Sequence, residues 1–364
     1  MQKYFKTITD PRQELKVDYQ LDEIVIMTIW AMISSCEEWE EIADFAEVNK
    51  EWFRKEIGLV LENGVASYHT FKRVFQIINP MELEESFVKW VKSISDLTEG
   101  EIVSIDGKTL RGSRDPKAKA IHLVNAWANN NGLVLGQVKV DEKSNEITAI
   151  PTLLEQLELK GCIVTIDAMG TQKDIAKQLA EHNDYVLALK GNHGDLHDDV
   201  KTYFELEKLP VGTFTIEKDH GRIEIREYFL ESNIEWLEDK DEWVGLQAIG
   251  AVRSTVTKNN KTTVEVRYFI TTLTDVETFA KAVRGHWGIE NSLHWCLDVV
   301  FNEDSSRMRK DYSAENISLI RKIALNALKS VTSRKSINMR RKKCHYDVNF
   351  RSEVLKALIQ RQRT

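Results

Sequence analysis

Residues 101–113 read EIVSIDGKTLRGS, and a second stretch of the same kind, residues 161–172, reads GCIVTIDAMGTQ. Each contains a short β-branched run that ends in an aspartate, Asp106 in the first stretch and Asp167 in the second. A run of this kind close to glycine predicts a buried strand. We therefore expect both aspartates at the carboxyl ends of buried strands, where α/β sheets open their functional crevice.

A third acidic residue, Glu290, lies in the helix-like stretch RGHWGIENSLHW, residues 284–295. A buried carboxylate is costly unless it is paired or binds a metal. Two strand-end aspartates and a glutamate from a later helix would form a set of hard oxygen ligands for Mg²⁺ or Mn²⁺. The pattern indicates two-metal phosphoryl transfer on nucleic acid, with two ions held by Asp106, Asp167 and Glu290.

The length of 364 residues predicts two or three domains, each large enough to bury a core. No stretch approaches the roughly 20 apolar residues that cross a bilayer, and the N-terminus MQKYFKTITDPRQ lacks an apolar signal core. We expect a cytoplasmic protein with no membrane partner. The four cysteines are scattered without a CxxC pair, which disfavours a zinc ribbon or a disulfide framework.

Positive charge is concentrated at the C-terminal end. Residues 331–364 contain ten Lys/Arg and two acidic residues, which gives this segment a charge of +8. Because the whole chain has a net charge of −7, the remaining residues carry −15. The densest part consists of Arg340, Arg341, Lys342 and Lys343. A basic tail is typical of proteins that bind the phosphate backbone, and a merely solvated tail is the alternative interpretation.

The order of predicted elements indicates the fold class. Residues 1–98 show apolar residues at helical spacing and predict a helical N-terminal domain. Residues 99–330 then predict strands and helices in the order βββαβαβ, with a β-rich insertion at about 195–275 and a further amphipathic helix after the Glu290 helix. This is the order of an α/β, RNase H-like core. Its first and fourth strands are parallel neighbours, so Asp106 and Asp167 should face one another.

Two other kinds of site are disfavoured. Four residues recur every four positions around the third acid: His286, Glu290, His294 and Asp298. The resulting HxxxExxxH spacing is not the HExxH of zinc proteases, so the histidines are expected beside DNA or in the core. The tripeptide GKT at 107–109 suggests a P-loop, but a Walker A motif needs glycine five residues before Gly107, where this chain has Ile102.

Basic residues near the acids are candidates for phosphate contacts, with a solvated surface as the alternative for each. Lys108 and Arg111 follow Asp106, and Lys190 ends the fifth predicted strand. In the insertion, HGRIEIR places Arg222 and Arg226 on one face of a strand.

Several sequence motifs, which follow one another in a fixed order along the chain, resemble those of a known family. They are CEEWEEIADF near the N-terminus, then SIDGKTLRGS, GQVKVDEKSNEITAIP, TIDAMGTQKDIA, YVLALKGNHGDLH, HGRIEIR and RGHWGIENSLHWCLDVVFNEDSSRMR. With these blocks the chain resembles the DDE transposases of bacterial insertion sequences, specifically the H-repeat-associated group. The resemblance implies an RNase H-like core with a β-strand insertion before the glutamate, and it carries the family triad over to Asp106, Asp167 and Glu290. Related transposases place Tyr, Arg and Lys around the glutamate at set intervals. This chain has Arg284 and His286 before Glu290 and no lysine one or two turns after it, and Arg284, His286 and Asn291 are its candidate DNA contacts there.

The resemblance also implies an activity and its partners. It implies metal-dependent cleavage and transfer of DNA strands, with Asp106 bridging two ions and the other two acids completing one site each. The expected partners are double-stranded DNA, as the element's terminal inverted repeats and as target, and further copies of the chain in a DNA-bound oligomer. A nuclease with the same core and a non-catalytic DNA-binding relic remain the alternatives. If Glu290 is not the third acid, Asp298 and Glu303 are the next candidates.

Overall fold

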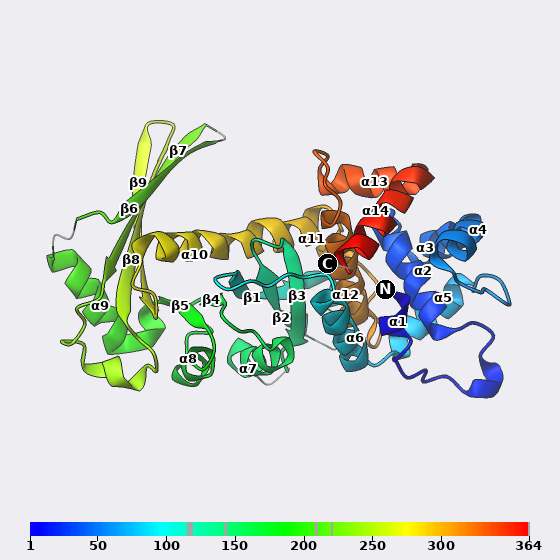
Figure 1. The fold of residues 1–364 in the computed structure, drawn as a ribbon, viewed down its shortest axis with the longest axis horizontal. Helices are drawn as coiled ribbons and strands as arrows, with labels where there is room; N and C mark the ends of the chain where they lie inside the picture. Colours follow the sequence, from blue (N-terminus) through cyan, green and yellow to red (C-terminus); the bar gives the residue numbers. More distant parts are fainter. Residues whose placement is uncertain (115–118, 142–143, 208–209, 220, 363–364) are drawn as a thin grey trace. The chain divides into compact units, whose positions relative to one another are not determined.

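The computed structural model describes residues 1–114, 119–141, 144–207, 210–219 and 221–362 (Figure 1). The chain forms two compact units. The first consists of Met1–Asp96, Gly107–Lys143 and Glu290–Thr364, and the second of Leu97–Asp106 and Ser144–Ile289. Within the described residues, no helix is long and apolar enough to cross a membrane.

Helices dominate the first unit, as the sequence predicted for the N-terminal region. They are α1 (Gln2–Phe5), α2 (Leu21–Ile33), α3 (Trp39–Val48), α4 (Lys50–Trp52), α5 (Tyr68–Ile77), α6 (Pro80–Lys92), α11 (Trp295–Val299), α12 (Ser313–Lys329), α13 (Ile337–Tyr346) and α14 (Val348–Arg361). The capping box between Glu38 and Glu41 starts α3, and the side chain of Asn79 caps α6, which has proline at its first position.

Helix α12 is the centre of this unit, because it packs against α2, α5, α6, α13, α14 and the strand β3 (Leu133–Lys139). The prediction of an amphipathic helix is therefore incomplete, since the polar side of α12 is buried too. Lys322, on that side, donates to the side chains of Gln137 and Ser318. Burial lowers its pKa to about 8. Hydrogen bonding of this kind is what permits a charged group in a core.

The C-terminal region is not a free tail. Its residues form α13 and α14, which pack on each other and on α12. Arg341 is buried, donates to Glu37 over 2.7 Å and to the carbonyl of Met32 over 3.0 Å, and lies 4.0 Å from the ring centre of Phe301. The expectation of a basic tail is therefore wrong, because these residues form two helices that pack on α12. The sequence showed the charge of this region, but it did not show the packing of α13 and α14 against the rest of the unit.

One nine-stranded sheet runs in the order β3-β2-β1-β4-β5-β9-β8-β7-β6. Its first five strands in the chain are β1 (Ile102–Leu110), β2 (Ile121–Ala128), β3, β4 (Ile163–Ile166) and β5 (Asp184–Leu189). The helices α7 (Glu146–Leu157) and α8 (Lys173–Ala180) precede β4 and β5. The order βββαβαβ and the α/β class are therefore as predicted, and the core is RNase H-like. One detail differs, because β1 continues four residues beyond Asp106 instead of ending there.

The insertion extends this sheet. It opens with α9 (Gly194–Leu206), a helix in a region predicted to be β-rich, and continues as β6 (Thr213–Asp219), β7 (Arg222–Glu231), β8 (Ala248–Lys258) and β9 (Lys261–Thr271). Strand β9 pairs antiparallel with β5, with Leu187 opposite Ile270, so the inserted strands join the core sheet directly. All four strands of the insertion are neighbours at one end of the sheet (Figure 1).

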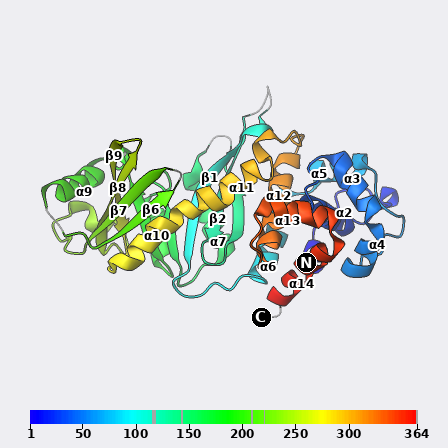
Figure 2. The ribbon, with the colours of Figure 1, turned by 90° about the horizontal axis from the view of Figure 1, so that it is seen from above.

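Helix α10 (Val276–Gly288) lies across the sheet in the second unit and packs on β4, β5, β6 and β7 (Figure 2). Phe279 is completely buried in the core cluster, which also contains Val186, Tyr228 and Phe269. A Cβ on Gly250 would come within 2.4 Å of the Phe279 ring, so only glycine at this position of β8 lets the helix approach the sheet.

Candidate active site

The two predicted aspartates occupy matching positions on neighbouring parallel strands. In the register of β1 and β4, Ser104 pairs with Thr165 and Ile105 with Ile166. Asp106 and Asp167 are the next residues on each side. The apolar residues of both strands are buried in the sheet, whereas both aspartates are only half-buried. The two acids that sequence reasoning singled out are therefore brought together by the pairing of the strands that precede them.

Asp167 is held by the turn that follows it. Its Oδ1 accepts hydrogen bonds from the backbone N–H groups of Met169 and Gly170, each over 3.1 Å. Gly170 is required here because a Cβ would come within 2.5 Å of the side chains of Ile150 and Ile166. Burial raises the pKa of Asp167 and is its largest influence, although the two N–H groups and Lys190 act in the opposite direction. The site thus contains a carboxylate whose ionised form is poorly solvated.

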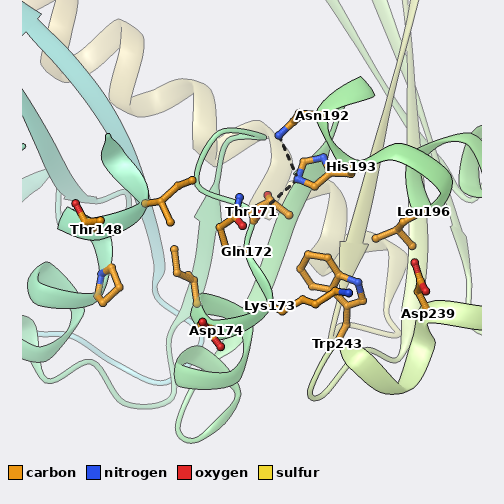
Figure 3. Close-up of a pocket in the computed structure, with 13 residues that line it drawn as sticks. Thr148, Thr171, Gln172, Lys173, Asp174, Asn192, His193, Leu196, Asp239 and Trp243 are labelled. Atoms are coloured by element: carbon orange, nitrogen blue, oxygen red, sulfur yellow. Dashed lines mark hydrogen bonds between the residues drawn. The ribbon is translucent and has the colours of Figure 1, made fainter. Parts of the chain in front are cut away.

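The loop after β5 contacts this turn directly, and Thr171, Asn192 and His193 together line a cavity of about 560 Å³ (Figure 3). Nδ2 of Asn192 donates to the carbonyl of Ala168 over 2.9 Å, and Nε2 of His193 lies 3.1 Å from the carbonyl of Thr171. Figure 3 shows Asn192 and His193 directed toward the turn at Thr171. These residues were not predicted as site residues, although the quoted block YVLALKGNHGDLH contains them. Their only signal was the position directly after the fifth strand.

The end of α10 is joined to both aspartate strands. The hydroxyl of Thr165 lies 3.1 Å from that of Ser104 and 2.9 Å from Nδ1 of His286, and Ser104 donates to the carbonyl of Gly285 over 3.4 Å. Burial lowers the pKa of His286 to about 4, so its ring is neutral at physiological pH. The sequence predicted that this histidine lies beside DNA or in the core. Its ring contacts Thr165 of β4, which is the second of these alternatives.

Glu290 follows His286 by about one helical turn, where α10 gives way to a π-helical segment, Ile289–His294. Its side chain is exposed, as is that of the neighbouring Asn291. A short π-helix inside an α-helix is uncommon and is often found at functional sites.

The donor set fits a divalent cation of the Mg²⁺ or Mn²⁺ type. Such ions prefer carboxylate oxygens, and a cation beside Asp167 would compensate the burial that raises its pKa. In the described part of the chain, no group of three or more His, Cys, Asp and Glu side chains is gathered closely enough to form a metal site by itself.

Several basic residues expected to contact phosphate are engaged within the protein instead. Lys108 is buried, and its Nζ lies 2.6 Å from Asp298 and 3.8 Å from both Glu303 and Asp304. This charge therefore neutralises acids of its own unit, a role that the sequence could not show because the partners lie about 190 residues away.

The basic residues of the insertion are paired as well. Arg226 is buried between Glu224 at 2.5 Å and Glu217 at 3.1 Å, and Arg284 of α10 contacts Glu217 at 2.8 Å. Arg222 lies 3.4 Å from Glu224 and is half-exposed. The predicted alternation along β7 is present, but its arginines pair with Glu224 and Glu217 on the same sheet, and Glu217 also pairs with Arg284 of α10.

The remaining candidates differ in exposure. Lys190 and Lys342 are exposed, and Arg111 is 82% exposed although it lies 3.6 Å from Asp304. Arg340 donates to the carbonyls of Leu328 and Val331 at the end of α12. Lys343 pairs with Asp347 at 3.4 Å. Of these cations, Lys190, Lys342 and Arg111 have the side chains most available to an external phosphate.

Comparison with known proteins places this arrangement in a family. A model described as "Transposase DDE domain" matches residues 97–327, and one described as "DDE_Tnp_1-associated" matches residues 2–91. The chain belongs to the DDE transposase family. It is 43% identical to a putative transposase, YncI, of Escherichia coli O157:H7, over 97% of this chain and 93% of that protein. It is 40% identical to the H repeat-associated putative transposase YhhI of Escherichia coli K12, over 98% of this chain and 97% of that protein.

Among solved structures, the transposase is similar to the piggyBac transposase in its synaptic complex with hairpin DNA, with a TM-score of 0.42 and 12% identity. The match covers 100% of this chain and 79% of that one. The predicted resemblance to H-repeat-associated transposases is confirmed by the family models and by the near full-length relatives.

Proposed function

We propose that this DDE transposase cleaves DNA at the ends of an insertion sequence and joins the freed ends to target DNA, using Mg²⁺ or Mn²⁺ held by Asp106, Asp167 and Glu290. The observation that carries the proposal is the register of β1 and β4, which sets two aspartates at the same level of the sheet. The match of residues 97–327 to the transposase domain supports the same assignment.

The chemistry requires little more than positioned charge. Water in the cleavage step, or a 3′-hydroxyl in the joining step, attacks phosphorus in line with the departing oxygen. Two metal ions, when bound, activate the nucleophile and stabilise the leaving oxygen. The three carboxylates would hold these ions, and the backbone donors to Asp167 keep one carboxylate oxygen fixed. Lys190 directly follows β5 and is exposed, and it would approach a phosphate of the bound strand.

The proposed partners are double-stranded DNA with the element's terminal inverted repeats, target DNA, and further copies of the chain in the DNA-bound complex. Phosphate contacts would position the DNA without reading its sequence. The proposed location is the cytoplasm, at the nucleoid.

A supercoiled donor plasmid that carries the element's own terminal repeats tests the proposal. The expected result with Mg²⁺ or Mn²⁺ is cleavage at the repeat ends, followed by joined products when target DNA is present. Cleavage without any joined product would indicate a nuclease with the same core. A shift of end-containing DNA without cleavage, even at high Mn²⁺, would indicate a DNA-binding relic.

A further inference from the structure

Three successive pairs of residues lie opposite one another along β1 and β4. Ser104 pairs with Thr165, Ile105 with Ile166, and the two aspartates come next. The first pair, Ser104 and Thr165, is polar and buried, since these residues are 0% and 2% exposed. Buried hydroxyls need partners inside the protein. Their partners lie on α10, the helix that leads into Glu290.

The hydroxyls form a chain of hydrogen bonds with one direction. Thr165 has a single hydroxyl proton, which it donates to Ser104 over 3.1 Å, and Ser104 donates to the carbonyl of Gly285 over 3.4 Å. The remaining contact, 2.9 Å between Thr165 and Nδ1 of His286, then requires a proton on Nδ1. This series of hydrogen bonds starts at the ring of His286 and ends at the carbonyl of Gly285, in the same turn of α10.

We propose that Ser104, Thr165 and His286 are positioning residues for Glu290. They fix the last turn of α10 against the two strands that carry the aspartates, and the helical path continues from His286 to Glu290 without a break. Groups that orient a metal ligand change metal affinity or activity by about 10- to 100-fold when they are removed. This inference rests on the proposed function, because it treats Glu290 as a metal ligand.

Two matched pairs of variants isolate the hydrogen bonds from simple packing. Thr165→Val keeps the shape of the side chain but removes the hydroxyl, whereas Thr165→Ser keeps the hydroxyl. The amide nitrogen of His286→Asn can stand where Nδ1 stands, whereas that of His286→Gln reaches the position of Nε2. The inference predicts that Ser and Asn preserve the positioning and that Val and Gln lose it.

The first measurement is hydrogen exchange by mass spectrometry in the peptide that covers residues 283–293. Thr165→Val and His286→Gln should exchange faster there, while Thr165→Ser and His286→Asn stay close to the wild type. The second is binding of Mn²⁺ to the full chain, followed by the electron paramagnetic resonance of the free ion. The dissociation constant should rise about 10- to 100-fold in the Val and Gln variants only. Thermal unfolding of all four variants provides the folding control.

The outcomes separate this inference from the proposed function. If the wild type binds Mn²⁺ and Asp106→Asn abolishes the binding, but the Val and Gln variants exchange and bind like the wild type, the positioning role is wrong and the proposed function stands. If His286→Gln behaves like the wild type and His286→Asn does not, Nε2 is the functional atom and the chain described above is overturned. If the wild type binds no Mn²⁺, or Asp106→Asn binds it equally well, the proposed metal site fails and this inference fails with it.

Discussion

Asp106 and Asp167 stand at the same level of two adjacent parallel strands, because each directly follows one member of the cross-strand pair Ile105 and Ile166. Parallel strands keep their carboxyl ends on one edge of a sheet, so the two acids share that edge. Their backbone surroundings differ. Asp106 lies within a strand that continues to Leu110, whereas Asp167 begins a turn whose N–H groups bind its carboxylate.

Loss of any proposed metal ligand should abolish cleavage. Asp106→Asn, Asp167→Asn and Glu290→Gln each remove a proposed ligand of a metal ion, and such an ion stabilises the transition state by several kcal/mol, so we expect a fall of at least about 100-fold in the cleavage rate. DNA affinity should change little, since it comes mainly from Lys and Arg. Nicking of end-containing plasmid and gel shifts measure the two effects. Glu277→Gln, at an exposed site of α10, is the matched control.

Full cleavage by Glu290→Gln would remove Glu290 from the triad. Asp298 and Glu303 would then be tested, although both have other partners: Asp298 pairs with Lys108, and Glu303 accepts from Ser318 over 2.8 Å.

Asp167→Asn should be at least as stable as the wild type at neutral pH. Burial raises the pKa of Asp167, so its ionised form costs folding free energy, whereas an asparagine oxygen can still accept the bonds from Met169 and Gly170. The sign follows from linkage: a carboxyl with a raised folded pKa destabilises the protein above that pKa, and the cost disappears as pH falls through it. Thermal unfolding of both proteins from pH 7 to pH 4 should show the gap closing. A variant that is less stable at pH 7 would contradict this account.

Arg341 should matter for stability and Lys342 should not. Arg341 is buried with Glu37 and the carbonyl of Met32, and removal of one partner of a buried ion pair costs about 3–5 kcal/mol. Lys342 is exposed in the same helix, so Lys342→Gln should change the free energy of unfolding by less than about 0.5 kcal/mol. Urea unfolding of Arg341→Gln and Lys342→Gln compares the two. Equal stability of both variants would return Arg341 to the list of DNA contacts.

Lys108→Met should destabilise the protein rather than weaken its hold on phosphate. The ammonium group lies beside Asp298, Glu303 and Asp304, and without it three acids repel one another in a partly buried place. We expect a loss on the order of 3 kcal/mol in urea unfolding. The dependence of DNA affinity on salt should be unchanged. A flatter salt dependence with normal stability would show that Lys108 contacts DNA after all.

Lys190 and Arg111 should contribute to DNA affinity through phosphate alone, because both are exposed. Each change to Gln should reduce the slope of log affinity against log salt by up to roughly 0.9 on duplex DNA. The loss should be equal for end-containing and unrelated sequences, since phosphate contacts do not read bases. Fluorescence anisotropy across a salt series measures the slope, with Lys177→Gln, exposed on α8, as the control. A loss confined to end-containing DNA would indicate contact with bases.

Much of the architecture could be predicted from local patterns. The β-branched runs before Asp106 and Asp167 predict strands because such residues pack well on a pleated, buried surface, and the order of elements selects the RNase H-like topology. That topology already predicts that the two aspartates face each other. The helix leading to Glu290 was equally accessible, because its apolar residues recur at helical spacing.

The charged residues were predicted less well, for a physical reason. The sequence does not distinguish a lysine or arginine that is solvated from one that binds DNA or forms an ion pair inside the protein. Only the tertiary structure shows which partner the side chain has. Lys108 finds Asp298, and Arg341 finds Glu37, across separations of about 190 and 300 residues. Pairing across such distances leaves no local pattern.

The sequence by itself determined the five core strands of this transposase, the helices α7, α8 and α10 and their order, and it singled out the three candidate acids, because these depend on side-chain shape and spacing along the chain. The tertiary structure alone decided that α12 is buried on every side, that the C-terminal charges are partly internal, and that Thr165 joins Ser104 to His286. Burial and hydrogen bonding between distant segments arise only when the whole chain packs, and they determine which charges remain available to DNA.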